Sequence, residues 1–232
     1  MATSCVSLAR GRMYRLTRLD ECGVPVVGAT SVVTSKGFVS VTSTPVYQDQ
    51  EDITQTDANG DTCIDDQSNP ALRWLEQTIL LCNLDPFAVN IITGDPVVVD
   101  DDTPTPNTVG WRWDASVSGT ANFALEVWSG IPGQACDPEG FPQYGYWLYP
   151  FVVQAQIQEY VVENGALTLG FTARTSAGSG WDVGPYDVRR DAVTPFAPEP
   201  LLTAISPTQH GHFEVSSAPL PTPACGATAL PA

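Results

Sequence analysis

The sequence predicts a mainly β fold, and three observations carry this prediction. From Phe123 to Val188 the chain consists of aromatic and β-branched runs, such as FALEVWSG and PQYGYWLYPFVV, interrupted by Gly, Pro and Asn at short spacing. This pattern is typical of antiparallel strands joined by turns. Gly and Pro number 19 and 20 of 232 residues, which indicates many turns and little helix. Only residues 86–93 carry both the start and the stop signals of a helix.

The first half of the chain begins with strands. Residues 13–44 contain MYRLTRL before the turn at residues 23–25, and SVVTS and GFVSVTS on either side of residues 36–37. Residues 46–66 predict a β-hairpin with Asn59 and Gly60 at its tip. Asn-Gly suits the left-handed backbone angles of a type I′ turn, so we expect that turn here.

One strand and one helix follow. Residues 71–82, ALRWLEQTILLC, are mixed on both faces, and a strand covered on both sides explains them as well as a helix does. For helix 86–93, Asp85 is the expected N-cap, the proline after it suits the first helical position, and Gly94 ends the helix. The helix is about two turns long and is expected to pack against the sheet.

The domain organisation follows from these patterns. Residues 1–190 are expected to form one β domain with an N-terminal arm at residues 1–12, and residues 191–232 form a Pro-rich C-terminal extension. Proline blocks ladder hydrogen bonds, so we expect an extended tail that lies on a surface and contains one short strand, HGHFEVS. Residues 95–109 predict a strand followed by an acidic loop, and residues 129–143 a long loop rich in Gly and Pro.

The charge distribution excludes several function classes. The chain has 10 basic and 26 acidic residues, a formal net charge of −16, which argues against binding to nucleic acid or to an anionic membrane surface. Five basic residues lie in the first 36 positions, whereas residues 37–173 contain only Arg73 and Arg112 against nineteen carboxylates. Three interpretations remain: a charge that only keeps the protein soluble, a surface that faces a polyanion without binding it, and pairing of the basic N-terminal stretch with the acidic body between subunits.

The lack of a recognisable targeting signal and the cysteine pattern both indicate that the protein is made and kept in a cytoplasm. No run reaches the roughly 20 apolar residues of a membrane span, and the N-terminus lacks the apolar core of a signal peptide. The six cysteines form no CxxC pair, which disfavours a zinc site. A reducing cytoplasm disfavours disulfides, so we expect free thiols that are mostly buried.

Two segments resemble metal sites. Residues 57–65 place oxygen ligands at alternate positions, as a calcium loop does, but the glycine is fourth instead of sixth and Ser68 stands where a glutamate should close the site. The hairpin explains this segment without a metal. His210 and His212 are expected on one face of a strand, where they could chelate a transition metal, but no third ligand is near in sequence and a solvated pair is the favoured interpretation.

The remaining reactive groups do not assemble into a catalytic pattern. Asp100–Asp102 and Glu126 could be paired carboxylates for sugar hydrolysis. A solvated charge run explains the aspartates better, and Glu126, between Leu125 and Val127, is expected to point outward from its strand. The tryptophans are expected in the core or at subunit contacts in preference to a sugar-binding face. We therefore expect no enzyme, with no catalytic residue, no cofactor and no metal.

The order of these segments resembles one family. RLTRLDECGVPVVGATSVVTSKGFVSVTSTP is followed by the acidic hairpin with NGDTCIDD, then by LRWLEQTILLCNLDPFAVNIITGDPVVVDD and FALEVWSGIPGQAC. The resemblance is strongest at PQYGYWLYPFVV and ENGALTLGFTARTSAGSGWDVGPYDV. Over these residues the chain resembles the major tail protein, or tail tube protein, of long-tailed (siphovirus-type) phages that infect actinobacteria.

The resemblance implies a structural virion protein. It implies a tail-tube-type β-sandwich or barrel with one short flanking helix, an extended hairpin and loops. Such proteins assemble in the host cytoplasm as hexameric rings that stack into the tail tube of the virion. The implied partners are further copies of the chain, the tape measure protein, and the tail terminator and distal tail proteins. Double-stranded DNA passes through the negatively charged lumen during infection without specific binding, and no membrane is involved.

Two alternatives remain open. One is a secreted or virion-surface carbohydrate-binding β-sandwich module, which the aromatic strands favour and the absent signal peptide disfavours. The other is a head–tail joining or tail terminator protein with a related fold.

Overall fold

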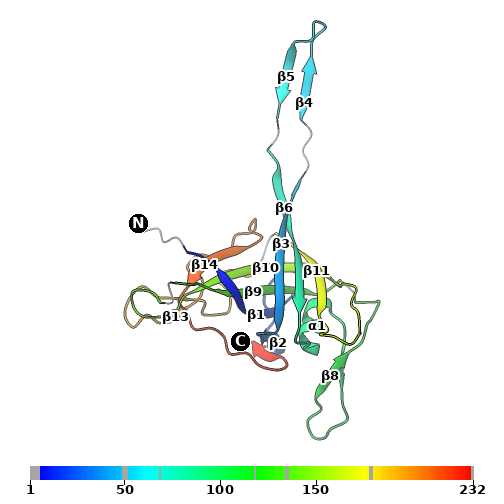
Figure 1. Cartoon of the computed structure of the whole chain (residues 1–232), viewed down its shortest axis with the longest axis vertical. Helices are drawn as coiled ribbons and strands as arrows, with labels where there is room; N and C mark the ends of the chain where they lie inside the picture. Colours follow the sequence, from blue (N-terminus) through cyan, green and yellow to red (C-terminus); the bar gives the residue numbers. More distant parts are fainter. Residues whose placement is uncertain are drawn as a thin grey trace.

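The chain is mainly β, as predicted, and its computed structural model describes residues 6–48, 52–67, 69–117, 119–133, 136–177 and 180–230 (Figure 1). In this part of the chain there is one helix, α1 (Pro86–Thr93). The strands are β1 (Ala9–Leu19), β2 (Gly28–Ser35), β3 (Phe38–Gln48), β4 (Ile53–Thr56), β5 (Thr62–Asp66), β6 (Ala71–Leu81), β7 (Val97–Val99), β8 (Thr108–Trp111), β9 (Asn122–Gly130), β10 (Tyr144–Ile157), β11 (Leu169–Thr175), β12 (Arg189–Arg190), β13 (Pro198–Glu199), β14 (His212–Ser216) and β15 (Thr228–Leu230).

Most strands belong to one antiparallel sheet in the order β15-β2-β1-β9-β10-β11-β6-β3. The long strand β10 pairs with β9 along one edge. Along its other edge it pairs first with β14, at Tyr144–Leu148, and then with β11, from Val152 onward. Gln154 has a φ of 55° at the register shift between β10 and β11. This bulge bends β10 just beyond the point where its partner changes.

The sheet folds over on itself, so that β3, at one end of the strand order, lies against β1. The rings of Tyr14 and Phe38 meet edge to face with centroids 5.9 Å apart. Gly11 lies at this crossing, where a Cβ would lie 2.3 Å from the tip of the Phe38 ring, so a larger residue would displace that ring. The fold is therefore sandwich-like, with the main core between the two parts of one sheet.

Helix α1 closes this core at the end of the sheet away from β4 and β5 (Figure 1). Its predicted bounds and caps are confirmed: Asp85 accepts a hydrogen bond from the Phe87 N–H, and Gly94, with a φ of 88°, donates its N–H to the Asn90 carbonyl. The buried apolar side chains of the helix (Ala88, Val89, Ile91 and Ile92) join Tyr14, Leu16, Phe123, Leu125, Val152 and Phe171 of the sheet in one cluster.

A second core lies on the opposite face of β1, β9 and β10. Successive strand residues point to opposite faces, so Met13, Trp128 and Tyr146 face away from the first core. The segment after residue 180 covers them with Trp181, Val188, Leu201 and Ile205. Because Leu201 and Ile205 are buried, the prediction of a tail that only lies on a surface is wrong for this part. The predicted short strand is present as β14, and β15 pairs with β2 at the edge of the sheet.

Two further expectations are resolved. Residues 71–82, for which strand and helix remained open, form strand β6 through Leu81. The five cysteines in the described residues (Cys22, Cys63, Cys82, Cys136 and Cys225) are unpaired and exposed, so the prediction of buried thiols is wrong for them. Each lies in a turn, a loop or the protruding hairpin and not in a core strand, which is why the hydrophobic pattern did not place it. Cys5 lies outside the described residues.

Candidate assembly surface

The most prominent feature of the molecule is a long β-hairpin that projects from the sheet, with β4 and β5 at its far end (Figure 1). It extends the predicted hairpin 46–66 at both ends, because β3 and β6 pair from Phe38–Leu81 to Gln48–Ala71. We call residues 45–74 the arm. All residues of β4 and β5 are exposed. An isolated two-stranded hairpin is at best marginally stable in water, so the end of the arm gains stability from any surface that covers it.

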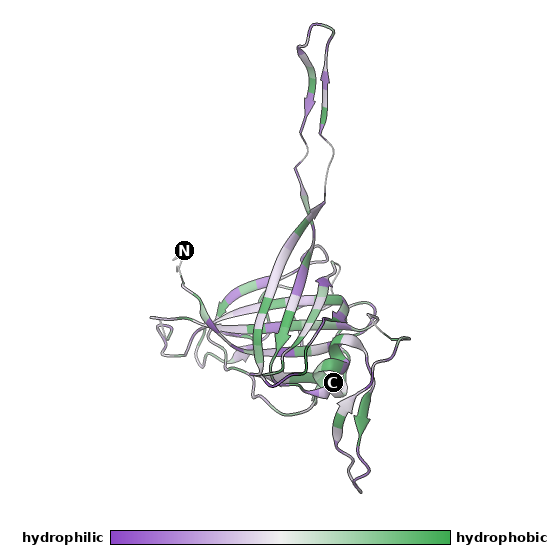
Figure 2. Cartoon of the chain, turned by 45° about the vertical axis from the view of Figure 1, so that its right-hand side comes forward, coloured by the Kyte–Doolittle hydropathy of each residue, from purple (hydrophilic) through white to green (hydrophobic). Residues whose placement is uncertain are grey.

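The arm carries apolar side chains that its own chain leaves uncovered. Tyr47 and Leu72 are directly paired across β3 and β6 and are 55% and 45% exposed. Near the tip, Ile53 and Ile64 are 58% and 48% exposed. The pairs Ile53–Asp66 and Gln55–Ile64 place these two isoleucines on the same face, as diagonal neighbours. Figure 2 shows apolar and polar residues interspersed along the whole arm. The paired positions of these exposed apolar side chains make the arm a candidate interaction surface.

The turn at the tip differs from the predicted type I′ turn. Asn59 does not have a positive φ, and only Gly60, at 91°, is left-handed. The Gly60 N–H donates to the Asp57 carbonyl, and the Asp57 N–H donates to the Asp61 carbonyl. This is the pattern of a type I turn followed by a glycine bulge. The Asp57 carboxylate accepts hydrogen bonds from the Asp61 and Asn59 N–H groups, which hold the pKa of that carboxyl below its usual value.

The arm is strongly acidic. Its described carboxylates are those of Asp52, Asp57, Asp61, Asp65 and Asp66, while Asp49, Glu51 and Ser68 lie outside the described residues. Arg73, its one basic residue, sits near the base with its guanidinium 4.2 Å from the Trp74 ring centroid. At the start of β1, Arg10 and Arg12 are exposed and make no ion pair with any described residue. The arm and the start of β1 therefore have opposite charge on one molecule.

An apolar groove lies at the base of the arm. It has a volume of 480 Å³ and is bounded by residues of β3, β6, β10, β14 and the segment before β14. Trp147 and Phe213 pack with ring centroids 4.4 Å apart, and Phe213 is 41% exposed. Ser43 donates a hydrogen bond of 2.6 Å to the Tyr149 hydroxyl inside the groove. The groove is continuous with the base of the arm, because Pro45 and Leu72 line it.

Glu126 does not point outward into solvent, and that prediction is wrong. It lies on the opposite face from Leu125 and Val127, as the alternation requires, but it is fully buried because the C-terminal segment covers that face. Arg15, its direct partner across β1 and β9, donates from Nε to Oε2 at 2.5 Å and from Nη2 to Oε1 at 2.6 Å. The Tyr146 hydroxyl adds a third hydrogen bond to Oε1 at 2.7 Å.

The Arg15 guanidinium is also enclosed by aromatic rings. Its central carbon lies 3.3 Å from the Tyr186 ring centroid and 5.2 Å from that of Trp128. The Tyr186 hydroxyl forms a 2.8 Å hydrogen bond with Thr17. Burial raises the pKa of Tyr186 to about 12, against the opposing effect of the Arg15 charge. Sequence reasoning missed Arg15, Tyr146 and Tyr186, because no local pattern distinguishes a buried arginine on a strand from an exposed one.

The two histidines are not arranged as a pair of metal ligands. His210 precedes β14, is buried, and its Nδ1 lies 2.9 Å from the Thr175 hydroxyl. Burial lowers the pKa of His210. His212 lies within β14 with Nε2 3.5 Å from the Glu214 carboxylate. Nowhere in the described part of the chain do three or more His, Cys, Asp or Glu side chains gather in a way that could hold a metal ion.

The acidic loop between β7 and β8 is held by its own hydrogen bonds. Asp100 accepts from the backbone N–H of Asn107 at 2.7 Å, which lowers the pKa of that carboxyl. Asp101 and Asp102 are exposed and Asp100 is half-buried in this loop, whereas Glu126 is buried with Arg15, so the structure does not bring them together as catalytic carboxylates. Of the tryptophans, Trp128 and Trp181 are buried as expected, but Trp113 is 61% exposed.

No protein-family model matches the chain, and a search of curated proteins finds no match. Across the described residues, no helix has the length and apolar character to cross a membrane.

The buried ion pair predicts a large loss of stability when one partner is removed. Glu126→Ala leaves the Arg15 charge buried and unpaired, so we expect the free energy of unfolding to fall by about 3–5 kcal/mol. Urea unfolding monitored by circular dichroism measures this. Glu139→Ala, which removes an exposed carboxylate, is the control and should change stability by less than about 0.5 kcal/mol. Equal effects of the two substitutions would contradict a buried pair.

The raised pKa of Tyr186 predicts alkaline destabilisation. An unfolded tyrosine ionises near pH 10. Because the folded state holds Tyr186 protonated up to about pH 12, its contribution to stability is complete below about pH 10 and is lost as the pH rises toward 12. Tyr186→Phe should therefore reduce the fall in urea midpoint between about pH 9 and 11. An unchanged fall would show that ionisation of Tyr186 plays no part in it.

Proposed function

We propose that this protein is the subunit of a phage tail tube, which polymerises as stacked hexameric rings. The observation that carries the proposal is the arm: a two-stranded projection with exposed apolar and acidic side chains and no cover from its own chain. A monomer gains nothing from such a projection, whereas a polymer buries it against the next subunit. The resemblance of residues 15–188 to the tail tube family supports the same function.

The charge supports a conduit for DNA. A net charge of −16, concentrated between residues 37 and 173, repels a polyanion and so removes sites at which DNA would stick. We propose that part of the acidity of residues 49–66 and 100–102 faces the lumen or the surface of the tube. In the described residues all of these carboxylates except that of the half-buried Asp100 are exposed, which leaves them available for that role.

The edges of the sheet support lateral assembly. Within the described residues, β3 pairs with β6 alone, so its other edge has backbone groups without a ladder partner. An exposed edge strand of eleven residues is an aggregation hazard unless another chain pairs with it. Closure of a ring by subunits that cover each other's edges removes this hazard.

The arm provides the test of the proposal. Purified protein should form tubes or stacked six-fold rings in negative-stain electron microscopy. Replacement of residues 53–66 by Asn-Gly removes the end of the arm, and we expect a folded protein that no longer forms tubes, because the stacking surface is lost. Circular dichroism checks the fold.

The matched control shortens the other projecting hairpin, at residues 100–107 between β7 and β8, and should leave tube formation intact. Tubes of normal length from the arm-shortened variant would contradict the role of the arm. A wild-type monomer that never polymerises would contradict the tail tube and favour a binding module, and a single ring that does not stack would indicate a terminator.

A further inference from the structure

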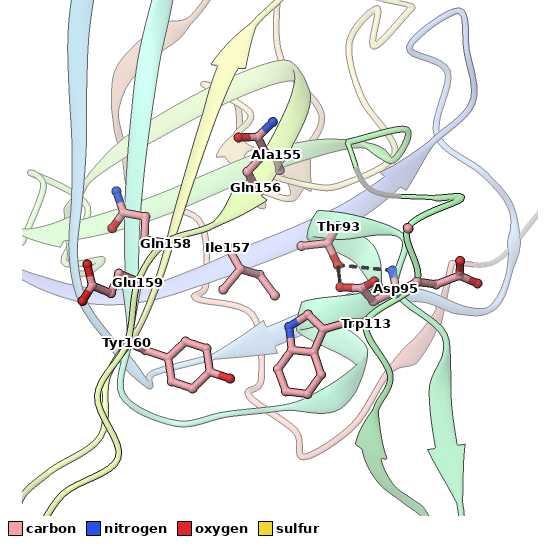
Figure 3. A pocket seen from close by; sticks show the side chains of 11 residues that line it. Thr93, Asp95, Trp113, Ala155, Gln156, Ile157, Gln158, Glu159 and Tyr160 are labelled. Carbon is pink, nitrogen blue, oxygen red and sulfur yellow. Dashed lines mark hydrogen bonds between the residues drawn. The ribbon is translucent and has the colours of Figure 1, made fainter.

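Two concave surfaces of the molecule differ in charge. One is a pocket of 680 Å³ beside the end of α1, where the rings of Trp113 and Tyr160 lie parallel to within 6° with centroids 6.4 Å apart (Figure 3). Its described lining includes the acidic residues Asp95, Asp114 and Glu159 and no Lys, Arg or His. The other is the 480 Å³ groove at the base of the arm, whose described lining residues carry no carboxylate. In a chain with a net charge of −16, an acidic partner therefore meets less repulsion at the groove.

Two arginines at the base of the arm have no carboxylate partner. Arg73 is exposed, Arg174 is half-buried, and neither forms an ion pair with any described residue. Their guanidinium carbons lie 4.2 and 4.9 Å from the ring centroid of Trp74. Glu76 is the direct partner of Arg174 across β6 and β11, yet no ion pair joins them. Nε1 of Trp74 is buried and has no acceptor in the described part of the chain. The base of the arm thus holds positive charge that its own chain does not neutralise.

A β-bulge brings this charge to the edge of the groove. Two consecutive residues of β3 pair with Trp74 and Leu72, so Arg73 is the extra residue on β6. The bulge shifts the alternation of β6, and Leu72 and Leu75 both line the groove although they are three residues apart. Arg73 therefore lies between two groove residues along the strand, and apolar and basic groups meet at the base of the arm.

The far end of the arm carries the complementary groups. Ile53 is paired with Asp66 across β4 and β5, and Ile64 lies on the same face, two residues before Asp66. This face combines two exposed isoleucines with an exposed carboxylate, and the exposed Asp61 and Asp65 add negative charge nearby. An apolar surface with negative charge thus matches an apolar groove with positive charge at its edge.

The two surfaces lie at opposite ends of the arm. β4 and β5 form its far end, whereas the groove lies at its base (Figure 1). A contact between them therefore joins different surfaces of two molecules. Such a head-to-tail contact can be repeated from copy to copy, as a stacked polymer requires.

We propose that the groove, with the two arginines beside it, receives the end of the arm of a second copy of this chain. Ile53 and Ile64 occupy the groove, and Asp66 pairs with Arg73. This inference rests on the proposed function, because it names the surface on which the arm of the neighbouring subunit stacks.

A binding measurement between variants tests the contact. The immobilised protein is the arm-shortened variant described above, which keeps the groove but has no arm end. The protein in solution is Arg73→Glu/Arg174→Glu, which keeps the arm end but cannot receive another arm. We expect biolayer interferometry to show binding. Introducing Arg73→Glu/Arg174→Glu into the immobilised protein as well should weaken it by at least about tenfold, or ~1.4 kcal/mol, because attraction becomes repulsion.

The matched control introduces Arg10→Glu/Arg12→Glu into the immobilised protein. These arginines are also exposed and the change in charge is the same, so binding should stay unchanged. Circular dichroism checks the fold of each variant, and Arg73→Glu alone is a second variant at an exposed position. Asp66→Arg in the dissolved protein should strengthen its binding to the surface that carries the two glutamates, because the opposite charges are then exchanged.

Equal binding to the immobilised proteins with and without Arg73→Glu/Arg174→Glu would overturn the proposal. Loss of binding with Arg10→Glu/Arg12→Glu alone would also overturn it, because the arm would then bind at the start of β1. Electron microscopy of the wild type keeps the two proposals apart. Wild-type tubes together with equal binding would refute this contact and leave the tail tube standing. The expected binding without wild-type tubes would support the contact and refute the tube.

Discussion

The buried ion pair between Arg15 and Glu126 is the interaction on which the rest of the structure depends. It joins β1 to β9 in the middle of the sheet, and the Tyr146 hydroxyl extends it to β10. A buried charge without its partner is expensive, so a shift of one residue between these strands would be strongly penalised. The pair thereby specifies the register of the three central strands. It also requires a cover that excludes water, and the C-terminal segment provides this with Tyr186 stacked on the guanidinium.

The Pro-rich segment after residue 190 packs on the same face of the sheet as Tyr186. The proline residues suggested an extension, yet Leu201 and Ile205 are as buried as most of the core. The segment makes few ladder hydrogen bonds, as proline dictates, and contributes apolar side chains instead. Asp85 connects the same region to the first core, since one carboxylate oxygen caps α1 and the other accepts the Gly226 N–H at 2.7 Å. The two faces of the sheet are therefore completed by the same stretch of chain.

The arm differs from the body of the protein in the surroundings of its side chains. In the body, the long strands place alternate side chains in a core. All residues of β4 and β5, in contrast, are exposed to water. The arm's isoleucines and carboxylates are exposed within the described residues. The exposed rings of Trp113 and Tyr160 differ again, because Trp111 packs edge-on against Trp113 and itself packs against the main core.

Local signals in the sequence predicted the helix and the hairpin, whose positions depend on neighbouring residues. The helix was predicted to the residue from Asp85, Pro86 and Gly94, because capping acts within one turn. The hairpin and its tip were predicted from Asn59 and Gly60, although the turn type was wrong because Asn-Gly is compatible with more than one turn. The strand character of residues 71–82 stayed open, because apolar residues at adjacent positions fit neither a helical nor a strand period.

The features that only the tertiary structure decided are those that depend on which surfaces are covered by distant parts of the chain. Alternation correctly placed Glu126 on the face opposite Leu125, but no local pattern reveals that residues 180–205, far away in sequence, bury that face. The pairing of Trp113 with Tyr160, separated by 46 intervening residues, is likewise visible only once β8 and the end of β10 lie together. The sequence by itself determined a β-rich, acidic chain with one capped helix and one long hairpin. Folding decided which charges are buried, which aromatic rings are exposed and which face of the sheet remains for a partner, because burial depends on contacts between distant segments.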